Sequence, residues 1–149
     1  MLRTIVALAV IGVAGPAAAS DKTDVMAAVN QFMDGFNKWD TKSMVAACAE
    51  PASVVDDFPP HAWQGASACA DWAKDFDAFC KQNAITSPNV VLAKPQHVDV
   101  TADRGYVVAP AKFNYKLKGK PTSEAGTFTV ALQKGAAGWR ITGWAWSKH

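Results

Sequence analysis

The chain has 149 residues, half of them hydrophobic, with 15 basic and 13 acidic side chains. This near-neutral balance argues against nucleic acid as a partner. The length suits one domain with a substantial core and is short for two.

The first residues have the pattern of a secretory signal peptide. Arg3 precedes an apolar run over residues 5–13, and small residues follow at 17–19. The apolar run is too short to span a membrane as a helix. We expect cleavage after Ala19, a single domain over residues 20–149, and a periplasmic or secreted protein without membrane contact after cleavage. A buried N-terminal helix is the alternative, which the glycines and the proline of this segment disfavour.

Three cysteines follow this segment, an odd number for an exported protein: Cys48, Cys69 and Cys80. If residues 66–81 form one helix, Cys69 and Cys80 lie about 16 Å apart along its axis, beyond disulfide reach. Any bridge is therefore expected to use Cys48. Three buried thiols are the alternative. The cysteines and histidines lack the spacing of a metal site, and no cofactor-binding motif is present.

The first half of the chain after this segment has helical periodicity. Residues 21–38 and 65–81 each carry an apolar stripe at three- and four-residue steps, which predicts two long helices. Between them, residues 43–49 predict a short helix that stops at Pro51, and residues 52–58 a short strand.

After Ser87 and Pro88 the period changes to two. Residues 90–101, 105–119, 126–135 and 138–149 are four strand-like runs separated by short turns, which predicts an antiparallel meander. Gly143 within the last run indicates a bulge or a close backbone approach. The expected fold is α+β, with helices packed on one face of a curled sheet.

Three segments in this order resemble a known superfamily. They are NQFMDGFNKWD in the first helix, ASVVDDF with Gly65 after it, and the closing GWRITGWAWSKH. They are similar to the SnoaL-like or nuclear transport factor two-like proteins, which include ketosteroid isomerase and scytalone dehydratase. The resemblance covers essentially all of residues 20–149. It implies a cone-like α+β barrel, in which a curved antiparallel sheet packs on about three N-terminal helices. It implies little about activity, because this fold hosts enzymes, binding proteins and interaction modules.

The resemblance makes Asp56 a candidate general base. In the isomerase branch an aspartate on the strand after the second helix moves a proton from carbon, and ASVVD places Asp56 there. A carboxylate at the mouth of an apolar cavity has a raised pKa and is a competent base. Asp57 is expected on the opposite face of the strand, so the two aspartates are not expected to act as a pair.

The other catalytic groups of the isomerase branch are missing. The resemblance places Phe32 where that branch has an oxyanion tyrosine, and Thr129 near its protonated aspartate. Without preorganised donors an enolate is not stabilised, so steroid isomerisation is not expected. A dehydratase needs a histidine acid or base. His97 could pair with Asp99 on one strand face, but a structural histidine explains it better.

Aromatic residues provide the remaining functional signal. Six of them are candidates for the wall of a flat apolar ligand pocket: Phe32, Phe58, Trp63, Tyr115, Trp144 and Trp146. Core filling is the alternative for each. We expect an exported protein that binds a small apolar ligand without a cofactor or metal. One alternative is a lyase or isomerase with Asp56 as base and water or Tyr115 as proton donor. The other is a module that forms a homodimer through the outer sheet face.

Overall fold

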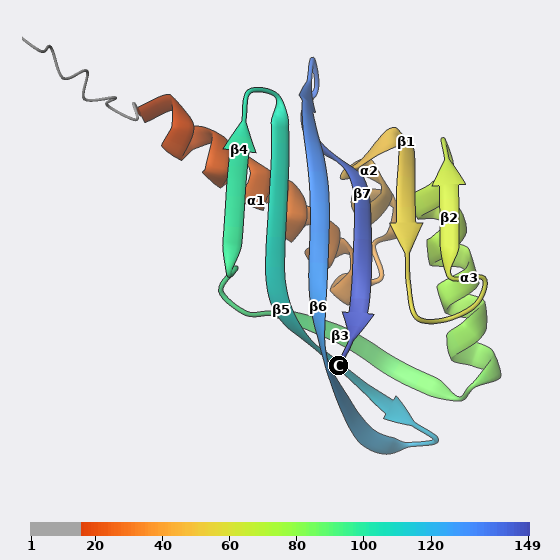
Figure 1. The fold of residues 1–149 in the computed structure, drawn as a ribbon. Helices are drawn as coiled ribbons and strands as arrows, with labels where there is room; N and C mark the ends of the chain where they lie inside the picture. The colour runs from red at the N-terminus through yellow and green to blue at the C-terminus, as the bar shows by residue number, and fades with distance from the viewer. Residues whose placement is uncertain (1–15) are drawn as a thin grey trace, which may run out of the picture.

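The computed structural model describes residues 16–149 (Figure 1). Most of the predicted signal peptide lies outside these residues, and cleavage after Ala19 stays a prediction. The elements in chain order are α1 (Pro16–Lys38), α2 (Thr41–Ala46), β1 (Cys48–Val55), β2 (Ala62–Gly65), α3 (Ala68–Gln82), β3 (Ile85–Leu92), β4 (His97–Thr101), β5 (Arg104–Leu117), β6 (Lys120–Gly135) and β7 (Gly138–Lys148).

The seven strands form one curved sheet. Their order is β2-β1-β7-β6-β5-β3, and β4 pairs with β5 beside β3. All neighbouring strands are antiparallel except β1 and β7, which are parallel, so the sheet is mixed. The helix α1 crosses one face of the sheet, and α3 packs behind β1 and β2 (Figure 1). The predicted α+β cone is confirmed, with one parallel pair that periodicity did not predict.

Hydrophobic spacing explains the long elements. In α1, Val25, Val29 and Phe32 are at most 1% exposed and face the sheet. In β5 every second residue from Gly105 to Ala111 is buried, as a half-buried strand requires. The core therefore lies between the helices and the concave face of the sheet.

The shorter elements differ from the prediction. The helix expected over residues 43–49 ends at Ala46, because Cys48 already pairs with Ile141 of β7. The strand β2 was not predicted. Its four residues pair with β1, where Trp63 lies opposite Val54, and this pairing delays the start of α3 to Ala68. The run over residues 90–101 is two strands, and each pairs with a different part of β5.

Gly143 has both features that its position predicted. The pairing of β7 with β6 shifts register there: Gly143 lies opposite Ala131 and Ile141 opposite Leu132, so Thr142 is the extra residue of a bulge. A Cβ on Gly143 would also lie 3.2 Å from the carbonyl oxygen of Ser53 in β1. Glycine therefore permits β1 and β7 to approach at this point.

A disulfide joins Cys48 at the start of β1 to Cys69 in the first turn of α3. The expectation that any bridge would use Cys48 is confirmed, and Cys80 is a buried free thiol. Disulfides persist in oxidising compartments, so this bond is consistent with a location outside the cytoplasm. Within residues 16–149, no helix is long and apolar enough to cross a membrane.

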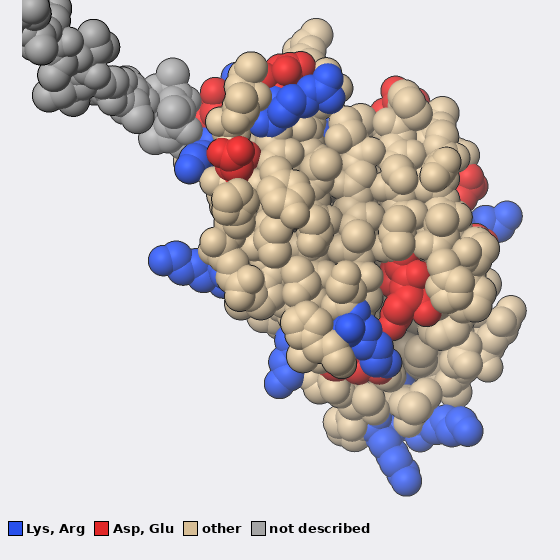
Figure 2. Space-filling view, viewed as in Figure 1, with Lys and Arg blue, Asp and Glu red and all other residues tan. Residues whose placement is uncertain are grey.

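The outer face of the sheet is largely uncharged. Figure 2 shows a broad area over β5, β6 and β7 that carries few charged side chains. Tyr106 is 44% exposed on this face. The homodimer expected through this face stays a prediction.

Replacing both Cys48 and Cys69 with alanine is expected to lower the free energy of unfolding by about 3 kcal/mol. The bond links residues 21 positions apart and restricts the unfolded chain. Urea unfolding with and without reductant measures the effect. Cys80→Ala keeps the bond and serves as the control, so its stability should still fall when reductant is added. A double variant as stable as the wild type would show that the bond does not stabilise the fold.

Candidate functional site

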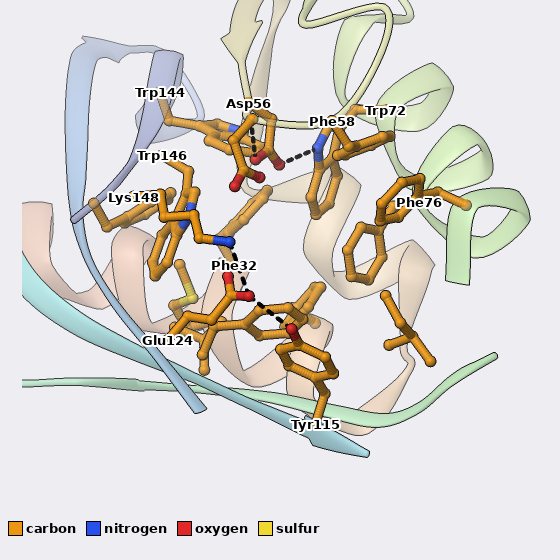
Figure 3. A pocket seen from close by; sticks show the side chains of 18 residues that line it. Phe32, Asp56, Phe58, Trp72, Phe76, Tyr115, Glu124, Trp144, Trp146 and Lys148 are labelled. Atoms are coloured by element: carbon orange, nitrogen blue, oxygen red, sulfur yellow. Dashed lines mark hydrogen bonds and ion pairs between the residues drawn. The ribbon is translucent and has the colours of Figure 1, made fainter. Parts of the chain in front are cut away.

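A cavity of about 280 Å³ lies inside the cone, between the helices and the concave face of the sheet (Figure 3). Most of its wall is aromatic. The rings come from α1, α3, the β1–β2 loop and strands β5 to β7: Phe32, Phe36, Phe58, Trp72, Phe76, Phe79, Phe113, Tyr115, Phe128, Trp144 and Trp146. Core filling therefore leaves a space large enough for a small molecule.

The rings support one another around Phe32. Its centroid lies 5.5 Å from that of Trp144, 5.9 Å from Phe128 and 6.1 Å from Trp72. Trp72 and Trp144 meet at 4.8 Å with their planes at 88°. Such tilted and edge-on contacts add to the stability of the packed wall.

A pair of hydrogen bonds and a glycine position two further parts of the cavity wall. The Asn37 side chain at the end of α1 donates to Val90 O at 2.8 Å and accepts from Val90 N at 2.7 Å, which holds β3 against the helix. Gly126 in β6 leaves room for the ring of Trp146, because a Cβ there would overlap it. Both contacts place cavity-lining residues of the sheet.

Asp56 is 9% exposed and lines the cavity, one residue past the end of β1. Its Oδ2 accepts a hydrogen bond from Trp72 Nε1 at 2.8 Å, and its Oδ1 accepts one from the backbone N of Asp57 at 2.7 Å (Figure 3). Burial raises the pKa of Asp56 to about 7, against the lowering effect of these two hydrogen bonds. Near neutral pH this carboxyl is therefore divided between its acid and its ionised form.

Asp57 is exposed to solvent, as expected, but the expectation that it faces away from the cavity was wrong. Asp57 also lines it, next to Asp56. Alternation applies only within a strand, and β1 ends at Val55. The chain then turns: Asp56 N donates to His61 O at 3.0 Å, and His61 N donates to Phe58 O at 2.9 Å. We call Asp56 and Asp57 the carboxylate pair. The charge of Asp57 is a further, smaller cause of the raised pKa of Asp56.

A second polar group lies across the cavity, at its rim (Figure 3). We call Tyr115, Glu124 and Lys148 the rim cluster. Glu124 Oε1 accepts from Tyr115 Oη at 2.6 Å and pairs with Lys148 Nζ at 2.9 Å. Desolvation raises the pKa of Glu124, but these two hydrogen bonds outweigh it and leave the pKa below its usual range. Burial, together with Glu124, raises the pKa of Tyr115 to about 12. The phenol proton is thus held by Glu124.

Five of the six aromatic candidates line the cavity, and Asp56 lies with them. The sixth, Trp63, is not among the lining residues. It is 6% exposed, its ring lies 5.1 Å from that of Phe58, and its Nε1 donates to Asp75 Oδ2 at 2.8 Å. Trp63 therefore supports the wall from behind.

Two further positions lie outside the site. Thr129 is on the outer face of β6, between the buried Phe128 and Val130, so it does not face Asp56. His97 and Asp99 are both exposed on β4, where the His97 ring packs edge-on against Tyr106. A structural histidine fits this placement.

Glu124, Lys148 and the hydrogen-bonding role of Trp72 were not predicted from the sequence. Strand alternation could have predicted Glu124 and Lys148 as cavity residues. Glu124 lies on the same strand face as Phe128, and Lys148 lies on the same face as Trp146. The run over residues 126–135 began too late to include Glu124. Helical periodicity predicts Trp72 only as a core residue of its helix, because its hydrogen bond to Asp56 depends on how α3 docks against β1.

No family model and no curated protein matches the chain. Solved structures do match. A ketosteroid isomerase-like protein from Erwinia carotovora atroseptica has a TM-score of 0.68 at 19% identity, over 86% of this chain and 95% of that one. A nuclear transport factor 2-like superfamily protein from Salmonella enterica has a TM-score of 0.73 at 16% identity, over 87% and 92%. A nuclear transport factor 2-like protein with a cystatin-like fold from Novosphingobium aromaticivorans has a TM-score of 0.73 at 12% identity, over 94% and 92%.

At these identities the likeness shows the fold and not the activity. The chain has the nuclear transport factor 2-like, ketosteroid isomerase-like α+β cone fold.

Proposed function

We propose that the protein binds a small apolar ligand in the aromatic cavity. The observation that carries the proposal is the open volume of about 280 Å³ among rings that otherwise pack closely. An apolar cavity of about 150 Å³ holds benzene, so this one suits a molecule of about two rings. The mostly apolar wall with a few convergent polar groups is typical of ligand sites.

We also propose that the protein is located in the periplasm or outside the cell. The basic residue, apolar run and small residues at the start of the chain support export. The Cys48–Cys69 disulfide supports an oxidising compartment.

A second candidate function is proton transfer by Asp56. A buried carboxyl whose pKa is about 7 on a cavity wall is the observation that favours it. The donors needed for an isomerase are a weaker match. Phe32 cannot donate a proton, and the hydroxyl of Tyr115 already donates to Glu124. We therefore rank binding above catalysis.

Ile85→Trp is expected to weaken the binding of 6-propionyl-2-(dimethylamino)naphthalene, a neutral fluorescent probe with two rings, at least tenfold. Ile85 lines the cavity, and a tryptophan there occupies space that the probe needs. Fluorescence titration gives the affinity. Val91→Trp is the matched control, because Val91 lies on the same strand, is 54% exposed and does not line the cavity. Equal affinities in the two variants would place the probe elsewhere.

As the pH rises from about 4 to about 7, the free energy of unfolding is expected to fall by at most about 1.4 kcal/mol per pH unit. In this range the folded protein keeps a proton on Asp56 that the unfolded chain has released, because the folded pKa is raised to about 7. The asparagine of Asp56→Asn cannot ionise, so the free energy of unfolding of this variant should depend less on pH over the same range. Urea unfolding at several pH values measures it, with Asp99→Asn as an exposed carboxylate control. An unchanged decline in Asp56→Asn would contradict the raised pKa.

If Asp56 acts as a base, the wild type should exchange the α-protons of 2-tetralone with deuterium at least on the order of a hundredfold faster than Asp56→Asn. This two-ring ketone suits the cavity and carries acidic C–H bonds. Proton NMR in deuterium oxide follows the exchange. If the wild type and Asp56→Asn both bind the ketone and exchange its protons at the same rate, Asp56 is not a base and ligand binding is the function.

A further inference from the structure

We propose that the ligand of this cavity is an apolar cation, an amine or quaternary ammonium compound with one or two rings. The inference rests on the proposed function and adds the charge of the ligand to it. It follows from which charged groups face the cavity and which of them already have a partner.

Four charged side chains line the cavity: Asp56, Asp57, Glu124 and Lys148. The lining residues of α1, α3 and β3 are all uncharged. Glu124 and Lys148 pair with each other at 2.9 Å. Two carboxyl groups remain, and both belong to the carboxylate pair.

None of the hydrogen-bond partners of Asp56 is a cation, and the side chain of Asp57 is itself one of them. Asp56 accepts from an indole N–H and a backbone N–H. Within residues 16–149, no lysine, arginine or histidine lies within 4.0 Å of either carboxylate. The charge of Asp57 contributes to the raised pKa of Lys148, but the ammonium group itself is held by Glu124. The wall therefore presents negative charge that the protein leaves without a close cation.

The surroundings of the carboxylate pair also suit a cation. The rings of Trp72 and Trp144 lie beside Asp56 in the cavity (Figure 3), and the ring of Phe32 packs against both of them. The faces of aromatic rings attract ammonium groups, and tryptophan does so best. A cation between these rings and the carboxylates would meet favourable electrostatics on both sides while its apolar part contacts the remaining rings.

Other ligand charges fit less well. An anion would meet two carboxyl groups, and the only lining ammonium group among the described residues is already paired. A neutral ligand would remove the carboxylate pair from water without offering a positive charge. Burying an ionised carboxylate in this way costs free energy. The two classes also differ in pH dependence. A cation favours ionised Asp56 and should bind more tightly as the pH rises through 7, whereas a neutral ligand favours the protonated form.

Two probes of the same shape test the proposal: benzyltrimethylammonium and its neutral carbon isostere, neopentylbenzene. Quenching of tryptophan fluorescence gives both affinities, since three tryptophans line the cavity. At pH 8 the cation is expected to bind at least tenfold more tightly than the isostere, and at pH 5.5 the difference should shrink. Asp57→Asn should reduce the preference for the cation at both pH values.

Asp99→Asn removes the same charge from an exposed site on β4 and is the matched control. It should keep the preference for the cation. If the isostere binds as tightly as the cation, or if Asp99→Asn lowers the preference as much as Asp57→Asn, the charge assignment is wrong while apolar binding stands. If neither probe binds and 6-propionyl-2-(dimethylamino)naphthalene also fails to bind, both the charge assignment and the proposed function are wrong.

Discussion

The hydrogen bond from Trp72 to Asp56 connects the helical layer to the sheet at the point where the cavity is built. It ties the middle of α3 to the residue just after β1, and the same carboxyl also accepts from the next backbone N–H. A buried carboxyl tolerates apolar surroundings only when it is hydrogen-bonded or protonated. The position of α3, the course of the β1–β2 loop and the raised pKa of Asp56 therefore depend on one another.

The cavity itself has an energetic cost, because unfilled space forfeits contacts that a packed core would make. Contacts around the cavity offset this cost. The disulfide fixes β1 to α3, Asn37 holds β3 against α1, and the rim cluster joins β5, β6 and β7. These connections surround the open space on several sides, so the wall keeps its shape without a filled centre.

Periodicity predicted the parts of the fold where a single rule operates over many residues. The stripe in α1 and the alternation in β5 are of this kind, while the bulge was predicted separately, from the single glycine at position 143. Periodicity failed where tertiary contacts decide the outcome. The four residues of β2 are too few to show a period, and Asp57 lies beyond the end of its strand. Asp56 and five aromatic residues of the site were predicted. Their hydrogen-bond partners, such as Trp72 for Asp56 and Glu124 for Tyr115, were not, because these contacts form only when distant segments pack together.

The bulge at Thr142 sets the phase of everything that follows it in β7. Before it Trp139 and Ile141 face the core, and after it the inward set is Trp144, Trp146 and Lys148. If Thr142 were instead paired in a regular alternation after Ile141, all three of these side chains would turn to the outer face. The inward direction of the last cavity residues therefore depends on the bulge itself and does not follow from their spacing in the sequence alone.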